Sequence, residues 1–331
     1  MSRRVSEAWY RPLGLSLRLR TDHEAVRTAA EDAFRGFGPG EPTAAPDLDF
    51  VLLTRKIGDA GGAGDIGDVG DVGNRGDRAD AGGEPPREYL VRGDRVRLRE
   101  GSSTLVVDRT RGEARGRLAP QLLAQPARLR LEFLELALQL MLPSRGFLGV
   151  HGAGIVRNGR AALLRGAGGT GKTTLAYAAA RGRFLALAED VVWMDVGQKV
   201  WWGLPWWAHP RPDAGRLFPE LAGLSPALVR NGTPKLAVRL EAVRPGSTVP
   251  RARPGPVVLL RRQSGETASR LTSIALPEAL DLWRAGRAGT EEEFPGYPGH
   301  VEALLRRNAW RLDLGDDLEG ALVRVEGLLA G

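Results

Sequence analysis

Residues 166–173 read Gly-Ala-Gly-Gly-Thr-Gly-Lys-Thr and match every fixed position of the pattern G-x-x-x-x-G-K-[ST]. The apolar run at 161–165 predicts a buried strand leading into this segment, and 173–180 predicts a helix that ends at Gly182. A strand, a glycine loop and a helix in this order form a phosphate-binding P-loop, a unit of α/β folds. The alternative is an ordinary Gly-rich turn, but the filled positions and both flanks favour the P-loop.

The loop has the chemistry to hold ATP and Mg²⁺. Its glycines let backbone N–H groups turn toward phosphate oxygens, and the N-terminus of the following helix adds its positive dipole end. We expect the Lys172 ammonium to contact the β- and γ-phosphates and the Thr173 hydroxyl to bind Mg²⁺. The expected nucleotide-binding residues are Gly166, Ala167, Gly168, Gly169, Thr170, Gly171, Lys172, Thr173 and Thr174.

Composition sets the broad class of the protein. The chain has 331 residues, enough for two modest domains, and 42% of them are apolar, enough for a core. It has neither an apolar run long enough to span a membrane nor an apolar segment typical of a secretory signal, so no membrane partner is expected. Without cysteine there are no disulfides, thiolate metal sites or Cys nucleophile, and a cytoplasmic protein is the simplest expectation.

The net charge of +7 raises the question of nucleic-acid binding. The only lysines are Lys56, Lys172, Lys199 and Lys235, and the many arginines are scattered rather than clustered. This bias, with abundant Ala and Gly, is more typical of a GC-rich coding sequence than of a surface that binds phosphate backbones. We therefore expect no nucleic-acid partner.

Residues 1–118 predict a small N-terminal α/β domain, from apolar and alternating runs. The expected strands are 13–19, 48–53, 89–91, 96–98 and 104–107, and the expected helix is 23–35. Within this domain, the Gly-Asp-x repeats of 57–86 have little apolar surface to offset the entropy of ordering, so we expect a disordered insertion. A calcium-binding β-roll is the alternative, but it needs a longer and regular repeat.

Residues 119–331 predict a second domain, which contains the P-loop. A helix with apolar residues at helical spacing is expected before Pro143, and a strand at 147–156 follows it. Asn158-Gly159 is a strong hairpin signal that would pair this strand with the strand entering the P-loop. Further expected elements are strands at 184–188, 191–194, 257–260 and 310–314, and helices at 277–284, 300–307 and 317–329.

Three titratable residues are candidates for chemistry beside the phosphates. Glu189 and Asp190 follow an apolar strand, where an acid of a P-loop protein binds Mg²⁺ or accepts a proton. The alternative is a pair of solvated acids at a strand end. His151 lies on the strand expected to pair with the P-loop strand, at the phosphate end of the sheet. A lone histidine in a strand is usually a core or surface residue, but the surrounding Val-His-Gly-Ala-Gly indicates more.

Together these segments resemble the catalytic domain of the HPr kinase/phosphorylase family. The similarity is greatest to its shorter, divergent bacterial relatives, some of which modify ribosomally made peptides such as lasso peptides. The resemblance covers about residues 147–196, and the order of a small N-terminal domain, a helix and the His strand is also similar. The matching segments are His151-Gly152-Ala153, Asn158-Gly159, 166–173 and Glu189-Asp190-Val191-Val192.

The resemblance implies an ATP-dependent kinase that transfers the γ-phosphoryl group to a Ser or other hydroxyl of a protein or peptide, such as a ribosomally made precursor peptide. It implies a catalytic role for His151 near the phosphates, for Lys172 and for the two acids. By analogy with the family, Glu189 activates the hydroxyl, and Asp190 binds Mg²⁺ together with Thr173.

The chain departs from the family at several positions. Glu189 stands where the family usually has Asp, and Gly168 and Thr173 stand where it often has Ser. The C-terminal signature Glu-Ile-Arg-Gly-Leu-Gly-Ile is absent, so HPr specificity, the phosphorylase reaction and the hexameric assembly are not carried over. A homo-oligomer stays open. Two other functions stay open as well: a nucleotide-binding regulatory protein without transfer activity, and a kinase of a small hydroxylated metabolite.

Two further features have two interpretations each. The aromatic segment 201–207 either grips a peptide or a base or is a buried loop, and the buried loop is favoured. Lys235 either reaches a phosphate or is a solvated lysine, and the solvated lysine is favoured. Weaker candidates are Arg211, Arg216 and Arg230.

Overall fold

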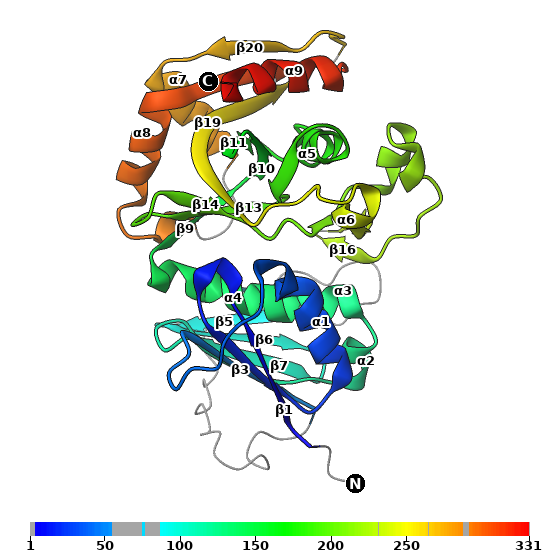
Figure 1. The fold of residues 1–331 in the computed structure, drawn as a ribbon, viewed down its shortest axis with the longest axis vertical. Helices are drawn as coiled ribbons and strands as arrows, with labels where there is room; N and C mark the ends of the chain where they lie inside the picture. Colours follow the sequence, from blue (N-terminus) through cyan, green and yellow to red (C-terminus); the bar gives the residue numbers. More distant parts are fainter. Residues whose placement is uncertain are drawn as a thin grey trace. The chain divides into compact units, whose positions relative to one another are not determined.

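The chain forms two compact units, each with a sheet and helices, and is a mixed α/β protein (Figure 1). The computed structural model describes residues 4–54, 75–76, 87–230, 232–263, 265–286 and 291–330. Unit 1 comprises Met1–Arg145 with Ala227–Pro234, and unit 2 comprises Gly146–Pro226 with Lys235–Gly331. The expected disordered insertion at 57–86 falls outside the described residues, apart from Arg75–Gly76.

Unit 1 is built on a mixed sheet, which among the described residues runs β1-β2-β3-β8-β7-β6-β5-β4. β2 and β8 both pair with β3 in parallel, and the remaining neighbours are antiparallel. The strands are β1 (Ser6–Tyr10), β2 (Leu17–Thr21), β3 (Leu48–Leu53), β4 (Arg75–Gly76), β5 (Arg87–Arg92), β6 (Arg95–Glu100), β7 (Ser103–Asp108) and β8 (Glu113–Arg117). All six residues of β3 are buried, as expected for a central strand.

Helices lie together on one face of the unit 1 sheet (Figure 1). The side chain of His23 caps α1 (Glu24–Phe34), and the helix buries residues at helical spacing from Val26 to Phe34. A nearly continuous helical segment packs beside it. This segment consists of α2 (Pro120–Leu123), α3 (Pro126–Leu129), a π-helix (Arg130–Glu135), α4 (Leu136–Met141) and a 3₁₀ turn (Leu142–Arg145).

The boundary between the units lies at Arg145–Gly146, not after residue 118 as expected. The helical segment belongs with unit 1 because it packs beside α1 and β7. Its apolar stripe also differs from the expected one: Phe133 is fully buried, but Leu136 and Leu140 are only half-buried. The π-helix explains this, because its extra residue per turn rotates the face that follows it.

Unit 2 is built on a second mixed sheet, ordered β12-β10-β11-β19-β14-β13-β9 among the described residues, with β21 also beside β19 and β20 beside β21. β11, β19 and β21 are parallel, so their carboxyl ends meet at one edge. The strands are β9 (Phe147–His151), β10 (Ala153–Arg157), β11 (Arg160–Arg165), β12 (Leu185–Ala188), β13 (Val191–Asp195), β14 (Val200–Trp202), β19 (Arg251–Arg262), β20 (Arg270–Ser273) and β21 (Ala309–Leu314).

Helices cover both faces of this sheet (Figure 1). On one face, α5 and α9 share a core with β11, β19 and β21, and on the other, α7 and α8 share a core with β9, β13, β14 and β19. The helices are α5 (Lys172–Arg181), α6 (Leu240–Val243), α7 (Leu276–Ala285), α8 (Tyr297–Asn308) and α9 (Leu318–Leu329). Two short ribbons remain among the described residues. In unit 2, β15 (Trp207–Ala208) pairs with β18 (Val238–Arg239). β16 (Leu228–Arg230) of unit 1 pairs with β17 (Thr233–Lys235), whose last residue is the first of unit 2 after the Ala227–Pro234 excursion.

The strand expected at 147–156 is two strands. β10 pairs with β11 through the Asn158-Gly159 turn, as predicted, but His151 ends β9, which pairs with β13 instead. The break falls at Gly152, where a Cβ atom would lie 2.8 Å from the carbonyl oxygen of Leu164. Only glycine fits this close approach, and it marks the point at which the chain changes partner.

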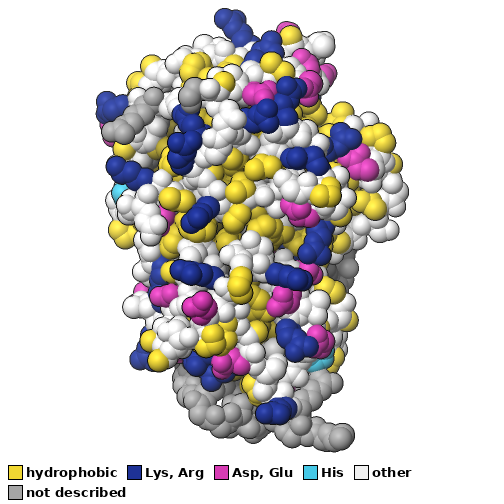
Figure 2. All heavy atoms as spheres, in the orientation of Figure 1, with side chains coloured by type: hydrophobic (Ala, Val, Ile, Leu, Met, Phe, Trp, Pro, Cys, Tyr) yellow, Lys and Arg dark blue, Asp and Glu magenta, His cyan; other side chains and the backbone are white. Residues whose placement is uncertain are grey.

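In the described part of the chain, we find no helix that combines the length and the apolar character needed to cross a membrane. On the face drawn in Figure 2, Lys and Arg side chains are spread among Asp and Glu side chains.

Candidate functional site

The predicted strand, loop and helix are present: β11 leads into residues 166–171, and α5 begins at Lys172. Gly171 has a φ of +98°, which favours glycine, and a Cβ atom at Gly166 would lie 2.7 Å from the carbonyl oxygen of Leu260. Gly168 and Gly169 are exposed. The loop therefore packs tightly against β19 at one end and offers open backbone at its centre, where an anion would meet N–H groups.

Lys172 turns back onto the loop. Its Nζ donates to the carbonyl oxygens of Gly166, at 2.7 Å, and Ala167, at 3.1 Å. Burial lowers the pKa of Lys172 below the ordinary lysine value, and the nearby charge of Asp190 opposes this shift. The ammonium thus lies within the curve of the loop, close to acidic neighbours.

Glu189 lies against the start of α5. Its Oε1 accepts a hydrogen bond of 2.8 Å from the Thr173 hydroxyl, and its Oε2 lies 3.1 Å from Nδ1 of His209. The Glu189 side chain is 12% exposed and that of His209 is 7% exposed. Burial alone would raise the pKa of Glu189, but its hydrogen bond and charge interaction with His209, with help from Thr173, lower it. The carboxylate is therefore held in its charged form.

The side chain of Asp190 lies beside His151. Its Oδ1 is 3.3 Å from Nδ1 of His151, and its side chain is 37% exposed. The pairing of Val191 with His151 between β13 and β9 brings the two side chains together, and the amide of Gly152 donates to the backbone oxygen of Asp190. The second acid is thus the more solvent-accessible one.

This arrangement differs from the expected sharing of a site by Thr173 and Asp190, because Thr173 contacts Glu189. Neighbouring side chains of an extended chain point to opposite sides. Two consecutive acids at the end of β12 therefore separate, one toward Thr173 and one toward His151.

A buried ion pair lies behind the loop. Arg165, the last residue of β11, is fully buried and forms two hydrogen bonds of 2.9 Å with the carboxylate of Glu291. Arg165 also donates to the carbonyl oxygen of His151, and Glu291 accepts from the amide of His151. Tyr297 donates to Glu291 at 3.0 Å, and Trp283 donates to Tyr297. This network fixes the end of β9, which carries His151, to the start of the P-loop.

Sequence reasoning missed His209, Arg165 and Glu291. His209 is one of four histidines and stands between an aromatic segment and a proline, which was the only available signal. Arg165 directly precedes the P-loop in a run of apolar residues, and a charge at the buried end of such a strand requires a partner. Nothing in the sequence around Glu291 distinguishes it from the two acids that follow it.

The four tryptophans of the aromatic segment differ in burial. Trp201 belongs to the core beneath α7 and α8, and Trp202 is buried as well. Trp206 and Trp207 are half-buried. The buried-loop interpretation is therefore confirmed for the first pair only. Among the weaker candidates, Arg211 and Arg216 are exposed.

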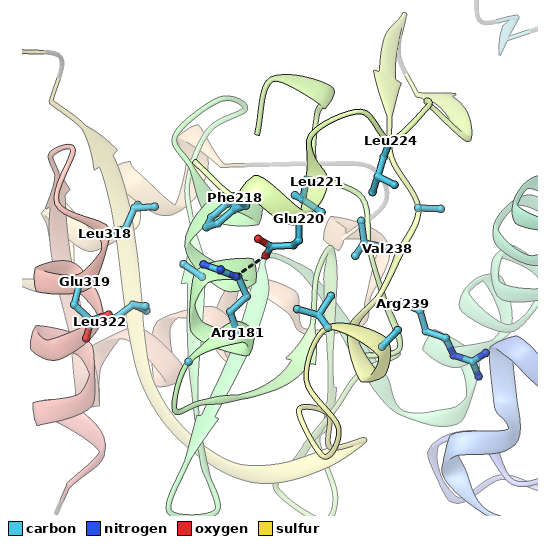
Figure 3. Close-up of a pocket in the computed structure, with 15 residues that line it drawn as sticks. Arg181, Phe218, Glu220, Leu221, Leu224, Val238, Arg239, Leu318, Glu319 and Leu322 are labelled. Atoms are coloured by element: carbon cyan, nitrogen blue, oxygen red, sulfur yellow. Dashed lines mark ion pairs between the residues drawn. The ribbon is translucent and has the colours of Figure 1, made fainter. Parts of the chain in front are cut away.

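A cavity of about 930 Å³ lies in unit 2, away from the P-loop (Figure 3). Arg181 and Gly182, which line it, stand at the C-terminal end of α5, about 14 Å along the helix from Lys172 at 1.5 Å per residue. Figure 3 shows Arg181 paired with Glu220 beside Phe218, with Leu318 and Leu322 of α9 across the cavity. The cavity is therefore separate from the residues that lie beside the P-loop.

A cation at this site would have few protein ligands. Among the described residues there is no cluster of three or more His, Cys, Asp and Glu side chains that would hold a metal ion by itself. Comparison of the sequence with models of known protein families gives no match, and comparison with curated proteins gives no match either.

Proposed function

We propose that the chain is an ATP-dependent kinase that transfers the γ-phosphoryl group to a hydroxyl of a protein or peptide, with an HPr-kinase-like catalytic domain in unit 2. The observation that carries this proposal is that two side-chain pairs, each with one acid, lie beside the P-loop. They are Thr173 with Glu189, and His151 with Asp190. The Thr173–Glu189 pair suits the Mg²⁺ of the nucleotide, and the His151–Asp190 pair suits the hydroxyl of an acceptor.

The Thr173 side chain fits a role in binding Mg²⁺ with the nucleotide. Its hydroxyl donates a hydrogen bond to Glu189 and keeps its oxygen lone pairs for a cation. Mg²⁺ is usually bound by one or two protein oxygens together with phosphates and waters, so the lack of a dedicated cluster among the described residues is compatible with it. Bound Mg²⁺ would neutralise charge that develops on the phosphate oxygens. Thr173 and Glu189 would hold it, which reassigns the role expected of Asp190.

The remaining residues have different roles in phosphoryl transfer. The loop amides and Lys172 hold the phosphates, and the positive end of α5 points at them. Asp190, which is accessible and oriented by His151, accepts the proton of the acceptor hydroxyl as the oxygen attacks phosphorus. The bond from phosphorus to the bridging oxygen of ADP breaks, and ADP leaves. Positioning and fixed charges supply most of the rate gain.

The exposure of Asp190 supports an acceptor that approaches from solvent, as a peptide or a protein segment does. Acidic and basic side chains are mixed on the face in Figure 2, and we propose a protein or peptide partner for the site. We place the activity in the cytoplasm, where ATP is available.

A transfer assay tests the proposal. The purified chain, Mg²⁺ and γ-labelled ATP are incubated with a library of Ser-, Thr- and Tyr-containing peptides. We expect label on hydroxyl side chains. Asp190→Asn should lower the transfer rate by about 10²–10⁴, the usual contribution of a general base, and leave ATP bound.

The matched control is Asp195→Asn, at the far end of β13 from Asp190. The asparagine side chain of this control would keep an oxygen to accept from the amide of Gln198, so its activity should equal that of the wild type. ATP binding without label on any peptide would support a regulatory nucleotide-binding protein, and label on small hydroxylated metabolites alone would support a metabolite kinase. Either result would contradict the proposal.

A further inference from the structure

Lys235 is the last residue of β17, and the segment that follows it is fixed beside the P-loop site. The next residue, Leu236, donates from its amide to the carbonyl oxygen of Pro210 at 2.9 Å. The pairing of Ala208 with Val238 fixes the same register two residues on. Lys235 therefore lies beside the segment that carries His209.

The contacts of His209 complete the path to the loop. His209 contacts Glu189, and Glu189 accepts from Thr173 at the start of α5. Leu236 is fully buried and shares a core cluster with Tyr177 of α5, which anchors this segment to the same helix. Two separate parts of the chain, 207–210 and 235–238, are thus fixed beside the P-loop by hydrogen bonds and packing.

The charges around Lys172 agree with this placement. Burial is the main reason that the pKa of Lys172 is lowered, and the positive charge of Lys235 acts in the same direction.

Lys235 is half-buried, and within the described residues no hydrogen bond or ion pair engages its ammonium. Arg165, by contrast, is compensated by Glu291. The charge of a half-buried lysine beside a phosphate-binding loop is stabilised when an anion lies against it. A nucleoside triphosphate is such an anion, and its terminal phosphate carries the charge that the loop amides do not cover.

We propose that Lys235 is a second phosphate-binding lysine, whose ammonium contacts the terminal phosphoryl group of a bound nucleoside triphosphate. This inference rests on the proposed function and deepens it. Lys172 and the loop amides would hold the phosphates of either nucleotide, and Lys235 would add a contact to the terminal phosphate that only ATP has.

Calorimetric titration with Mg-ATP and Mg-ADP tests the inference without any acceptor. Lys235→Met should weaken ATP binding by at least about tenfold, or about 1.4 kcal/mol, and leave ADP binding unchanged. Lys235→Arg should restore part of the preference for ATP, because it keeps a positive charge. The matched control is Lys199→Met, an exposed lysine in the turn between β13 and β14, which should bind both nucleotides as the wild type does.

Thermal melting of each variant checks the fold, and Lys235→Gln replaces Lys235→Met if the latter does not melt cooperatively. An unchanged ratio of ATP to ADP affinity in the folded variant would overturn the role of Lys235 alone, since the wild type would still bind nucleotide. A wild-type chain that binds neither nucleotide would overturn the proposed function, and this inference with it.

Discussion

At the scale of single residues, the two consecutive acids have different environments. Glu189 is nearly buried between Thr173 and His209, and Asp190 is over a third exposed beside His151. The hydrogen bonds of Glu189 lower its pKa in spite of burial, which suits a permanent negative charge near a cation. Asp190 has the access that a proton acceptor needs. We propose the division of roles from these environments and not from the order of the two residues.

Replacing Glu189 tests its part of this division. Glu189→Gln keeps an oxygen that accepts from Thr173 but removes the negative charge. The Mg²⁺ concentration that half-saturates ATP binding should rise by at least about tenfold, as for the loss of about 1.4 kcal/mol. Titration of Mg²⁺ at fixed ATP measures it.

Asp190→Asn is the control for that titration, and its Mg²⁺ requirement should equal that of the wild type. If Asp190→Asn instead raises the requirement and Glu189→Gln does not, the roles originally expected from the sequence are correct.

At the scale of elements, the site depends on how β9 and β11 are held together. They are not hydrogen-bonded neighbours in the sheet, yet both end at the P-loop. Arg165 and Glu291 bridge them through the backbone of His151. A salt bridge with a fully buried arginine is costly to break from one side, because the remaining charge stays buried without compensation.

Glu291→Gln should therefore destabilise the chain by about 3–5 kcal/mol. The matched control is Glu302→Gln, which removes an exposed i,i+4 pair with Arg306 and should cost about 0–1 kcal/mol. Denaturant unfolding of both variants gives the comparison. Equal stabilities would show that the Arg165–Glu291 pair does not hold these strands.

Local signals predicted many elements. The glycine pattern and its flanks predicted β11, the loop and α5, and the Asn158-Gly159 pair predicted the turn between β10 and β11. Contacts between distant segments were not predicted. His209 lies 20 residues beyond Glu189, and Glu291 lies 126 residues beyond Arg165, and no periodicity records such pairings. The partner change at Gly152 was missed because the apolar run continues through it.

At the scale of the whole molecule, the two units are not simple halves of the sequence. Ala227–Pro234 belongs to unit 1 although it interrupts unit 2, and Lys235 is the first residue after the return. Composition and local patterns identify neither this excursion nor the boundary at Arg145, because both are set by which residues pack together. Unit 2 nevertheless contains every residue to which we assign a role in phosphate binding and transfer.

The central claim is that the loop of unit 2 binds the phosphates of ATP through Lys172. Calorimetric titration of the wild type and of Lys172→Ala with Mg-ATP tests it most directly, with Lys199→Ala as the control. We predict saturable binding at one site in the wild type and the control, and an affinity at least about tenfold lower in Lys172→Ala. Wild-type affinity in a folded Lys172→Ala chain, or no binding by the wild type, would contradict the account.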